Sequence, residues 1–139
     1  MLDIGANTGL VTLQTINLAR NLHDYHLFEP IPLHVQAIRH NLSSVGSPVT
    51  VQVHPVALSD TNGSATIFTE QLNHGNSSFL QQAIVYPDEQ IETEVQTVDT
   101  SDYFSDFCDD TPLFVLKCDT QGMDALVLSR LPDKVWAKV

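Results

Sequence analysis

The spacing of apolar residues changes from segment to segment, and it is typical of a helix in some segments and of a strand in others. Apolar residues recur at three-residue spacing over residues 8–22 and predict an amphipathic helix. The short apolar run 25–30 (YHLFEP) predicts a strand that stops at its proline, and Pro32 then suits the first turn of a second helix, which ends before Gly46. Residues 49–59 (VTVQVHPVALS) alternate in their first half and predict the next strand.

Predicted strands and helices continue in the second half of the chain, after a turn at 60–63 (DTNG). Residues 70–90 are polar, with NHGNSS at 73–78 in their centre, and we predict that they form the most mobile loop. The elements expected around this loop, in chain order, are strands over 64–69 and 94–98, a short helix over 99–107, a strand covered on both faces over 112–119, a helix over 123–131 and the start of a further strand over 134–139.

The order of these elements predicts one α/β domain that spans residues 1–139. Strands and helices alternate, a hairpin interrupts them, and a strand–helix–strand unit ends the chain, which indicates a doubly wound, mainly parallel sheet between helical layers. Such sheets bind ligands beyond the carboxyl ends of their strands, at the topological switch point. Four segments fall at such ends, and we expect them to meet at one edge: residues 3–9, 28–30, 56–60 and 119–122.

The charge of the chain narrows its possible partners. Six Lys and Arg against seventeen Asp and Glu give a formal net charge of −11, which argues against nucleic acid or an anionic membrane, because both require clustered cations. No apolar run approaches the roughly 18 residues of a membrane span and no secretory signal follows Met1, so we expect a cytoplasmic protein. Two cysteines indicate no disulfide framework, and His23 and His26 have no further ligands nearby in sequence to indicate a metal site.

The first candidate for chemistry is the loop Gly5-Ala6-Asn7-Thr8-Gly9, which follows a short strand and opens a helix. A dinucleotide fingerprint requires G-x-G-x-x-G so that the backbone can approach a pyrophosphate, whereas Asn7 holds the middle position here. Asp3 would repel a phosphate and attract an ammonium group, so the loop suits S-adenosylmethionine better than NAD. Glu29, at the end of the second strand, can accept hydrogen bonds from both hydroxyls of a ribose.

Six short motifs occur in order between residues 3 and 131: DIGANTG, FEPIP, VALSDTNG, NHGNSSF, VQTVDT and LKCDTQGMDALVL. In this order they resemble the motifs of FkbM-type methyltransferases. The resemblance implies an S-adenosylmethionine-dependent enzyme with the seven-stranded, Rossmann-like class I fold, which methylates a hydroxyl group of a small molecule or sugar. Compared with that fold the first strand is short and the chain stops inside the fifth strand, so we expect a partial domain that lacks most of strands five to seven.

The resemblance also implies roles for individual residues, carried over by position. The cofactor-binding residues would be Asp3, Gly5, Ala6, Asn7 and Gly9 at the methionyl group, Glu29 at the ribose, and Ala57, Leu58 and Asp60 at the adenine. Asp119 would face the methyl group and the acceptor. From the chemistry of proton removal we predict Asp119 as the leading base, with His74 and His54 as alternative bases. Gln121 stands where the family commonly has an acid, and Asp124 where it has a longer one, so both departures bear on acceptor binding or proton removal.

Two further hypotheses accompany the methyltransferase. One is a non-catalytic remnant or binding module on the same scaffold, suggested by the length of the chain and by Gln121. The other is a dinucleotide-dependent oxidoreductase, which Asp3 and the spacing of the glycines disfavour. The sequence names neither the acceptor nor the oligomeric state.

Overall fold

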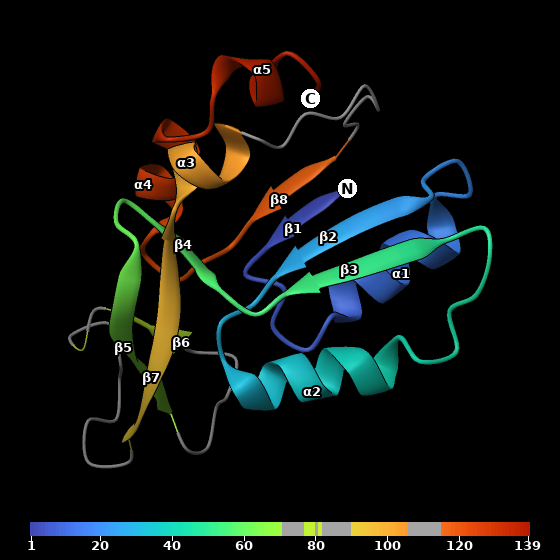
Figure 1. The fold of residues 1–139 in the computed structure, drawn as a ribbon. Helices are drawn as coiled ribbons and strands as arrows, with labels where there is room; N and C mark the ends of the chain where they lie inside the picture. The colour runs from blue at the N-terminus through green and yellow to red at the C-terminus, as the bar shows by residue number, and fades with distance from the viewer. Residues whose placement is uncertain (71–76, 80, 82–89, 106–114) are drawn as a thin grey trace.

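A computed structural model describes residues 1–70, 77–79, 81, 90–105 and 115–139. Within these ranges the chain forms two four-stranded sheets flanked by helices (Figure 1). The elements, in chain order, are β1 (Leu2–Ile4), α1 (Leu10–Leu18), β2 (Asp24–Phe28), α2 (Pro32–Asn41), β3 (Thr50–His54), β4 (Ala57–Ser59), β5 (Gly63–Glu70), β6 (Ser77–Ser78), β7 (Gln90–Asp99), α3 (Thr100–Ser105), β8 (Leu116–Cys118), α4 (Asp124–Ser129) and α5 (Asp133–Trp136).

The first sheet is entirely parallel and has the strand order β3-β2-β1-β8. Ile4, the last residue of β1, pairs with Phe28 on one side and with Cys118 on the other, and Phe28 in turn pairs with His54. The carboxyl ends of all four strands therefore lie at one edge. The chain builds outward from β1 to β3 and then returns to place β8 on the opposite side of β1, so the switch point lies between β1 and β8.

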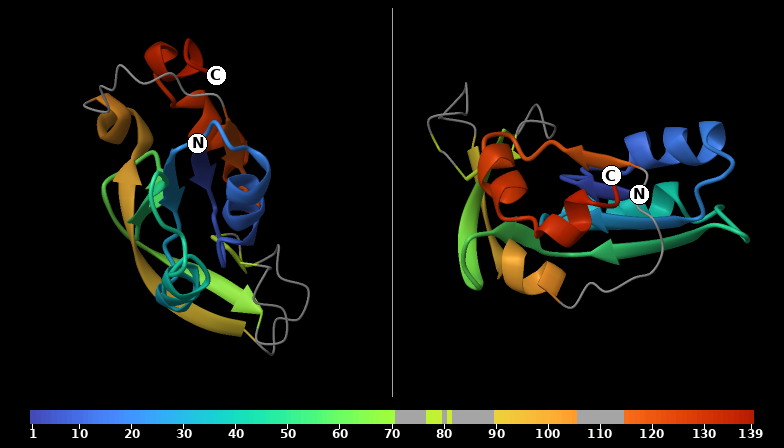
Figure 2. Two further views of the ribbon diagram at one scale, coloured as in Figure 1. Left: turned by 90° about the vertical axis from the view of Figure 1, so that its right-hand side faces the viewer. Right: turned by 90° about the horizontal axis from the view of Figure 1, so that it is seen from above.

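Helices cover both faces of this parallel sheet (Figure 2). On one face α1 and α2 pack over a core that includes Tyr25, Leu27 and Ile38. On the other face α3, α4 and α5 enclose a second core, in which Phe104 and Val127 are fully buried. The predicted α/β domain with a parallel sheet is confirmed for this part of the molecule.

The second sheet corrects the prediction of one continuous strand over residues 49–59. That segment divides at Pro55: β3 ends at His54 in the first sheet, and β4 begins at Ala57 in the second, whose order is β4-β7-β5-β6. Proline has no N–H to continue a ladder, which is the local reason for the break. β5 and β7 form a long antiparallel pair, and β4 joins β7 in parallel (Figure 1). The hairpin excursion is thus a sheet of its own.

Three predicted elements near the ends of segments also differ. Residues 134–139 were expected to begin a strand, but α5 occupies Asp133–Trp136, with Val135 buried against the core and Pro132 preceding the first turn. α1 ends at Leu18 rather than residue 22. β8 covers only Leu116–Cys118, and its side chains are half-buried rather than covered on both faces. Residues 106–107 and 112–114 of the predicted elements lie outside the described residues.

No helix in the described ranges is both long enough and apolar enough to cross a membrane.

Candidate functional site

A cavity opens beyond the carboxyl ends of β1, β2 and β8 and is closed on its far side by the second sheet. Three of the four predicted end segments reach its wall directly after their strands, and the fourth reaches it through β4. Its wall consists of Ile4, Gly5, Asn7, Phe28, Glu29, Pro30, Ile31, His34, Val56, Ala57, Leu58, Ile67, Ser77, Ser78, Phe79, Asp119, Thr120, Gln121 and Met123. The structure therefore confirms that segments distant in sequence meet at one edge of the sheet.

The glycine loop turns sharply directly after β1. Gly5, Asn7 and Gly9 all have positive φ angles, of 73°, 52° and 76°. The N–H groups of Gly5 and Ala6 both donate to the carbonyl oxygen of Phe28, at 3.0 and 3.1 Å, which holds the loop against β2. A Cβ atom on Gly5 would lie 2.0 Å from the carbonyl oxygen of Asp119, so the two turns approach more closely than any side chain allows.

Asp3 lies beneath this loop and does not line the cavity. Its carboxylate is fully buried. Oδ2 accepts a hydrogen bond from the hydroxyl of Thr12 at 2.6 Å, and Oδ1 pairs with Nζ of Lys117 at 2.9 Å. Lys117 also donates to the carbonyl oxygen of Gly5 at 2.8 Å. The alternation of side chains along β1 directs Asp3 towards α1, so its charge supports the loop from below.

Glu29 directly follows β2 and is buried in the wall of the cavity. Its Oε2 accepts a hydrogen bond from the N–H of Asn7 at 2.8 Å. Its Oε1 accepts one from the N–H of Ile31 at 3.0 Å and lies 3.3 Å from Nδ1 of His34. The carboxylate thus joins the glycine loop to the start of α2 while facing the cavity.

Asp119 follows β8 and presents an exposed carboxylate to the cavity. The side-chain amide of Gln121 donates to its Oδ1 at 2.7 Å. Asp124 caps the turn by accepting from the N–H groups of Thr120 and Gly122, at 2.8 and 3.3 Å. Burial alone would raise the pKa of Asp124, but these backbone hydrogen bonds outweigh it and lower that pKa. The shorter acid at position 124 therefore shapes the turn that carries Asp119.

The remaining predicted cofactor residues divide into two groups. Ala57 and Leu58 are buried and line the cavity. Ala6 packs into the core beneath α1 and α2, and Gly9 is the residue before α1, where a Cβ would lie 3.3 Å from Ile38. Neither lines the cavity, because Ala6 points into the core and Gly9 lies against α2.

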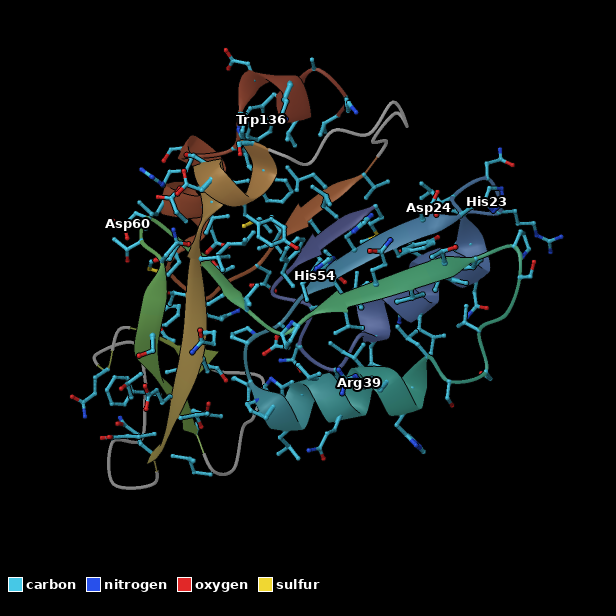
Figure 3. The ribbon with its side chains drawn as sticks, in the orientation of Figure 1. His23, Asp24, Arg39, His54, Asp60 and Trp136 are labelled. Atoms are coloured by element: carbon cyan, nitrogen blue, oxygen red, sulfur yellow. The ribbon has the colours of Figure 1, made fainter. Side chains whose placement is uncertain are left out.

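Asp60, like Asp3, Ala6 and Gly9, does not line the cavity. It is exposed on the turn after β4 and lies apart from the parallel sheet (Figure 3). The hydroxyl of Ser59 donates to its Oδ1 at 3.3 Å. His74, the alternative base, lies outside the described residues.

His54, the other alternative base, belongs to an aromatic cluster and does not line the cavity. Nδ1 lies 2.7 Å from the hydroxyl of Tyr103, Nε2 lies 3.1 Å from Nδ1 of His26, and the ring stacks on Phe28 at 4.6 Å between centroids. Burial, together with repulsion from His26, lowers the pKa of His54 to about 4. These contacts give His54 a packing role at the carboxyl end of β3 (Figure 3).

Sequence reasoning missed one buried polar residue of the site, His34. It lies in the first turn of α2, five residues after Glu29, and that spacing was the only available signal. Reasoning from sequence also left open the charge of the cavity. All six Lys and Arg residues belong to the described ranges and none lines the wall, whereas two carboxylates, Glu29 and Asp119, do. Among the described residues, no cluster of three His, Cys, Asp or Glu side chains could hold a metal ion.

These features define an α/β domain with a ligand cavity at the switch point of a parallel sheet. A family model, the methyltransferase FkbM domain, matches residues 3–138, and the chain belongs to this family. It is therefore a methyltransferase domain. Comparison with curated proteins and with solved structures gives no match.

Proposed function

We propose that this domain is an S-adenosylmethionine-dependent O-methyltransferase that holds its cofactor in the cavity described above. Membership of the FkbM family supports the transfer of a methyl group. The order β3-β2-β1-β8, with its switch point beside β1, follows the first four strands of a doubly wound sheet, which supports the Rossmann-like class I fold.

The charge of the cavity is the observation that carries the choice of cofactor. S-adenosylmethionine combines an ammonium and a sulfonium cation and has no phosphate. A wall with two carboxylates and no Lys or Arg attracts such a ligand and repels a pyrophosphate. Apolar side chains of the second sheet and its approach, among them Val56, Leu58 and Ile67, provide a surface for the adenine ring.

Three groups of residues on the cavity wall suit the three parts of the cofactor. Glu29 binds the ribose, and Ala57 and Leu58 pack against the adenine. Gly5 and Asn7 leave room for the methionyl group beside the turn that carries Asp119. Asp3, through Lys117 and Thr12, supports the loop without entering the cavity.

Asp119 is the proposed residue for the acceptor. When bound, S-adenosylmethionine supplies a methyl group activated by its sulfonium. The chain must then align a hydroxyl oxygen and receive its proton, and an exposed carboxylate at the cavity wall can do both. The acceptor is a hydroxyl group of a small molecule or sugar. The amide of Gln121, at 2.7 Å from Oδ1, leaves Oδ2 of Asp119 to face that hydroxyl.

Calorimetric titration with S-adenosylmethionine tests the cofactor site. Glu29→Gln keeps the shape of the side chain and removes its charge, and we expect its affinity to fall by about 10- to 100-fold, the loss of a charge-assisted hydrogen bond. Glu94→Gln, on the exposed side of β7, is the matched control and should bind like the natural chain. Equal affinity of Glu29→Gln and the natural chain would contradict this site.

The alternative of a non-catalytic binding module has one supporting observation, the hydrogen bond that Gln121 makes to the proposed base. A methyl-transfer assay across hydroxylated acceptors separates the two functions. Asp119→Asn should retain cofactor binding and lose methyl transfer. If the natural chain binds the cofactor but methylates none of the acceptors, the binding module becomes the better hypothesis.

A further inference from the structure

Within the described part of the chain, one ring nitrogen of His34 has no hydrogen-bond partner. Its side chain is 4% exposed, and the residue belongs to the cavity wall. Nδ1 lies 3.3 Å from Oε1 of Glu29, and because an ionised carboxylate only accepts hydrogen bonds, Nδ1 carries the hydrogen. Nε2 is buried, and no residue in the described part of the chain makes a hydrogen bond with it. A buried ring nitrogen left unpaired is unfavourable, so Nε2 is placed to bind a polar group of a ligand.

Glu29 by itself has too few open positions to bind a diol. Its carboxylate offers about four lone-pair positions. The N–H of Asn7, the N–H of Ile31 and Nδ1 of His34 already occupy three of them. About one position, on Oε2, is left for a ligand, whereas a ribose presents two hydroxyls. The second hydroxyl needs another partner, and the ring that contacts Oε1 supplies one.

We propose that His34 shares the recognition of the cofactor ribose with Glu29: Nε2 of His34 binds one hydroxyl and Oε2 of Glu29 binds the other. This inference rests on the proposed function. A hydroxyl both donates and accepts hydrogen bonds, so it satisfies Nε2 in either protonation state of the ring. His34 is then the residue that makes the site specific for a complete ribose rather than a deoxyribose.

The test uses S-adenosylhomocysteine and its 2′-deoxy and 3′-deoxy derivatives, titrated calorimetrically into the intact chain. In His34→Asn the shorter amide keeps a donor near the position of Nδ1, so it can still contact Glu29, but has no atom at the position of Nε2. His40→Ala is the matched control, because His40 lies exposed on the same helix. His34→Gln is the rescue variant, since its longer amide reaches the position of Nε2.

The pattern across the three ligands is the expected result. His34→Asn binds S-adenosylhomocysteine about tenfold more weakly, and His40→Ala binds it within about twofold of the natural chain. One deoxy derivative binds the natural chain about tenfold more weakly than S-adenosylhomocysteine does. On the His34→Asn chain, this derivative and S-adenosylhomocysteine bind with equal affinity. The other deoxy derivative binds both chains more weakly than S-adenosylhomocysteine does, because it lacks the hydroxyl that Glu29 recognises in both. His34→Gln restores the discrimination.

Three results overturn the proposal, and they show whether only the assignment of His34 fails or the proposed function fails as well. If both deoxy derivatives keep their full losses in a folded His34→Asn chain, Nε2 binds the adenine or a water molecule instead, and only the assignment of His34 fails. The same holds if Glu29→Gln weakens binding while His34→Asn does not. If the natural chain binds neither S-adenosylmethionine nor S-adenosylhomocysteine, the proposed function fails and this inference fails with it.

Discussion

The buried pair of Asp3 and Lys117 offers the sharpest test of how the glycine loop is supported. Lys117→Met removes the charge and keeps most of the volume. It leaves a carboxylate that is 0% exposed without its cation, and breaking a buried pair costs about 3–5 kcal/mol. Lys117 is itself 22% exposed, so water moderates the loss to about 3 kcal/mol. The lost hydrogen bond to the carbonyl oxygen of Gly5 adds about 1 kcal/mol, for a total near 4 kcal/mol.

Urea unfolding followed by circular dichroism measures this loss directly. Arg39→Met is the control, because Arg39 lies exposed on α2 (Figure 3) and its replacement should change the free energy of unfolding by less than about 0.5 kcal/mol. A loss of less than about 1 kcal/mol in Lys117→Met would refute the claim that this pair is buried and structurally required.

The double variant Asp3→Asn, Lys117→Met then separates support from ligand contact. It removes the uncompensated charge while the amide oxygen of the asparagine still accepts from Thr12, so about 2 kcal/mol of the lost stability should return. If Asp3 acts only through the loop, affinity for S-adenosylhomocysteine returns together with stability. Recovery of stability without any recovery of affinity would show that the carboxylate of Asp3 contacts the ligand, and the support model would be wrong.

Three further predictions concern the loop, the aromatic cluster and a cysteine. Gly5→Ala should lose at least about 2 kcal/mol of stability, since its Cβ would lie 2.0 Å from a carbonyl oxygen, whereas Gly46→Ala, with nothing within 4 Å, should be nearly neutral by the same urea titration. The fold keeps the pKa of His54 near 4, below its ordinary value of 6.5, so the unfolded chain binds the proton first and stability falls with acidification between these values. The free energy of unfolding should fall between pH 7 and pH 5 by up to about 2 kcal/mol more in the natural chain than in His54→Gln. Equal pH dependence of the two chains would exclude His54 as the cause. Partial burial and the nearby carboxylate of Asp124 raise the pKa of Cys118 to about 12. In a Cys108→Ser chain its thiol should therefore react with a disulfide reagent at pH 8 at least about 100-fold more slowly than free cysteine, and a rapid reaction would contradict the raised pKa.

Periodicity and turn chemistry were enough to predict the parallel sheet. The apolar run before each of the first two loops forms β1 and β2, and the helix starting at Pro32 begins where its proline requires. These signals are local, since each strand or helix start depends on a few adjacent residues. The division at Pro55 into two sheets was missed, because alternation along residues 49–59 does not show which strands will pair.

Predicted site residues line the cavity where their motif directly follows a strand of the parallel sheet. Gly5, Asn7, Glu29 and Asp119 line it because each follows the carboxyl end of a parallel strand or lies in the loop after one. Asp60 does not line the cavity, although Ala57 and Leu58 of the preceding strand do, because Asp60 lies on the exposed turn after β4.

The sequence by itself determined the family, the loop–strand order and the acidic character of the chain, because these depend on short motifs and on composition. Only the tertiary structure decided which groups surround each acid. Asp3 supports the loop because Lys117, 114 residues away, neutralises it in the core. Glu29 has one open position because three donors from the loop and α2 surround it, and that same packing brings His34 into the cavity. Burial and pairing arise between distant segments, so no reading along the chain supplies them.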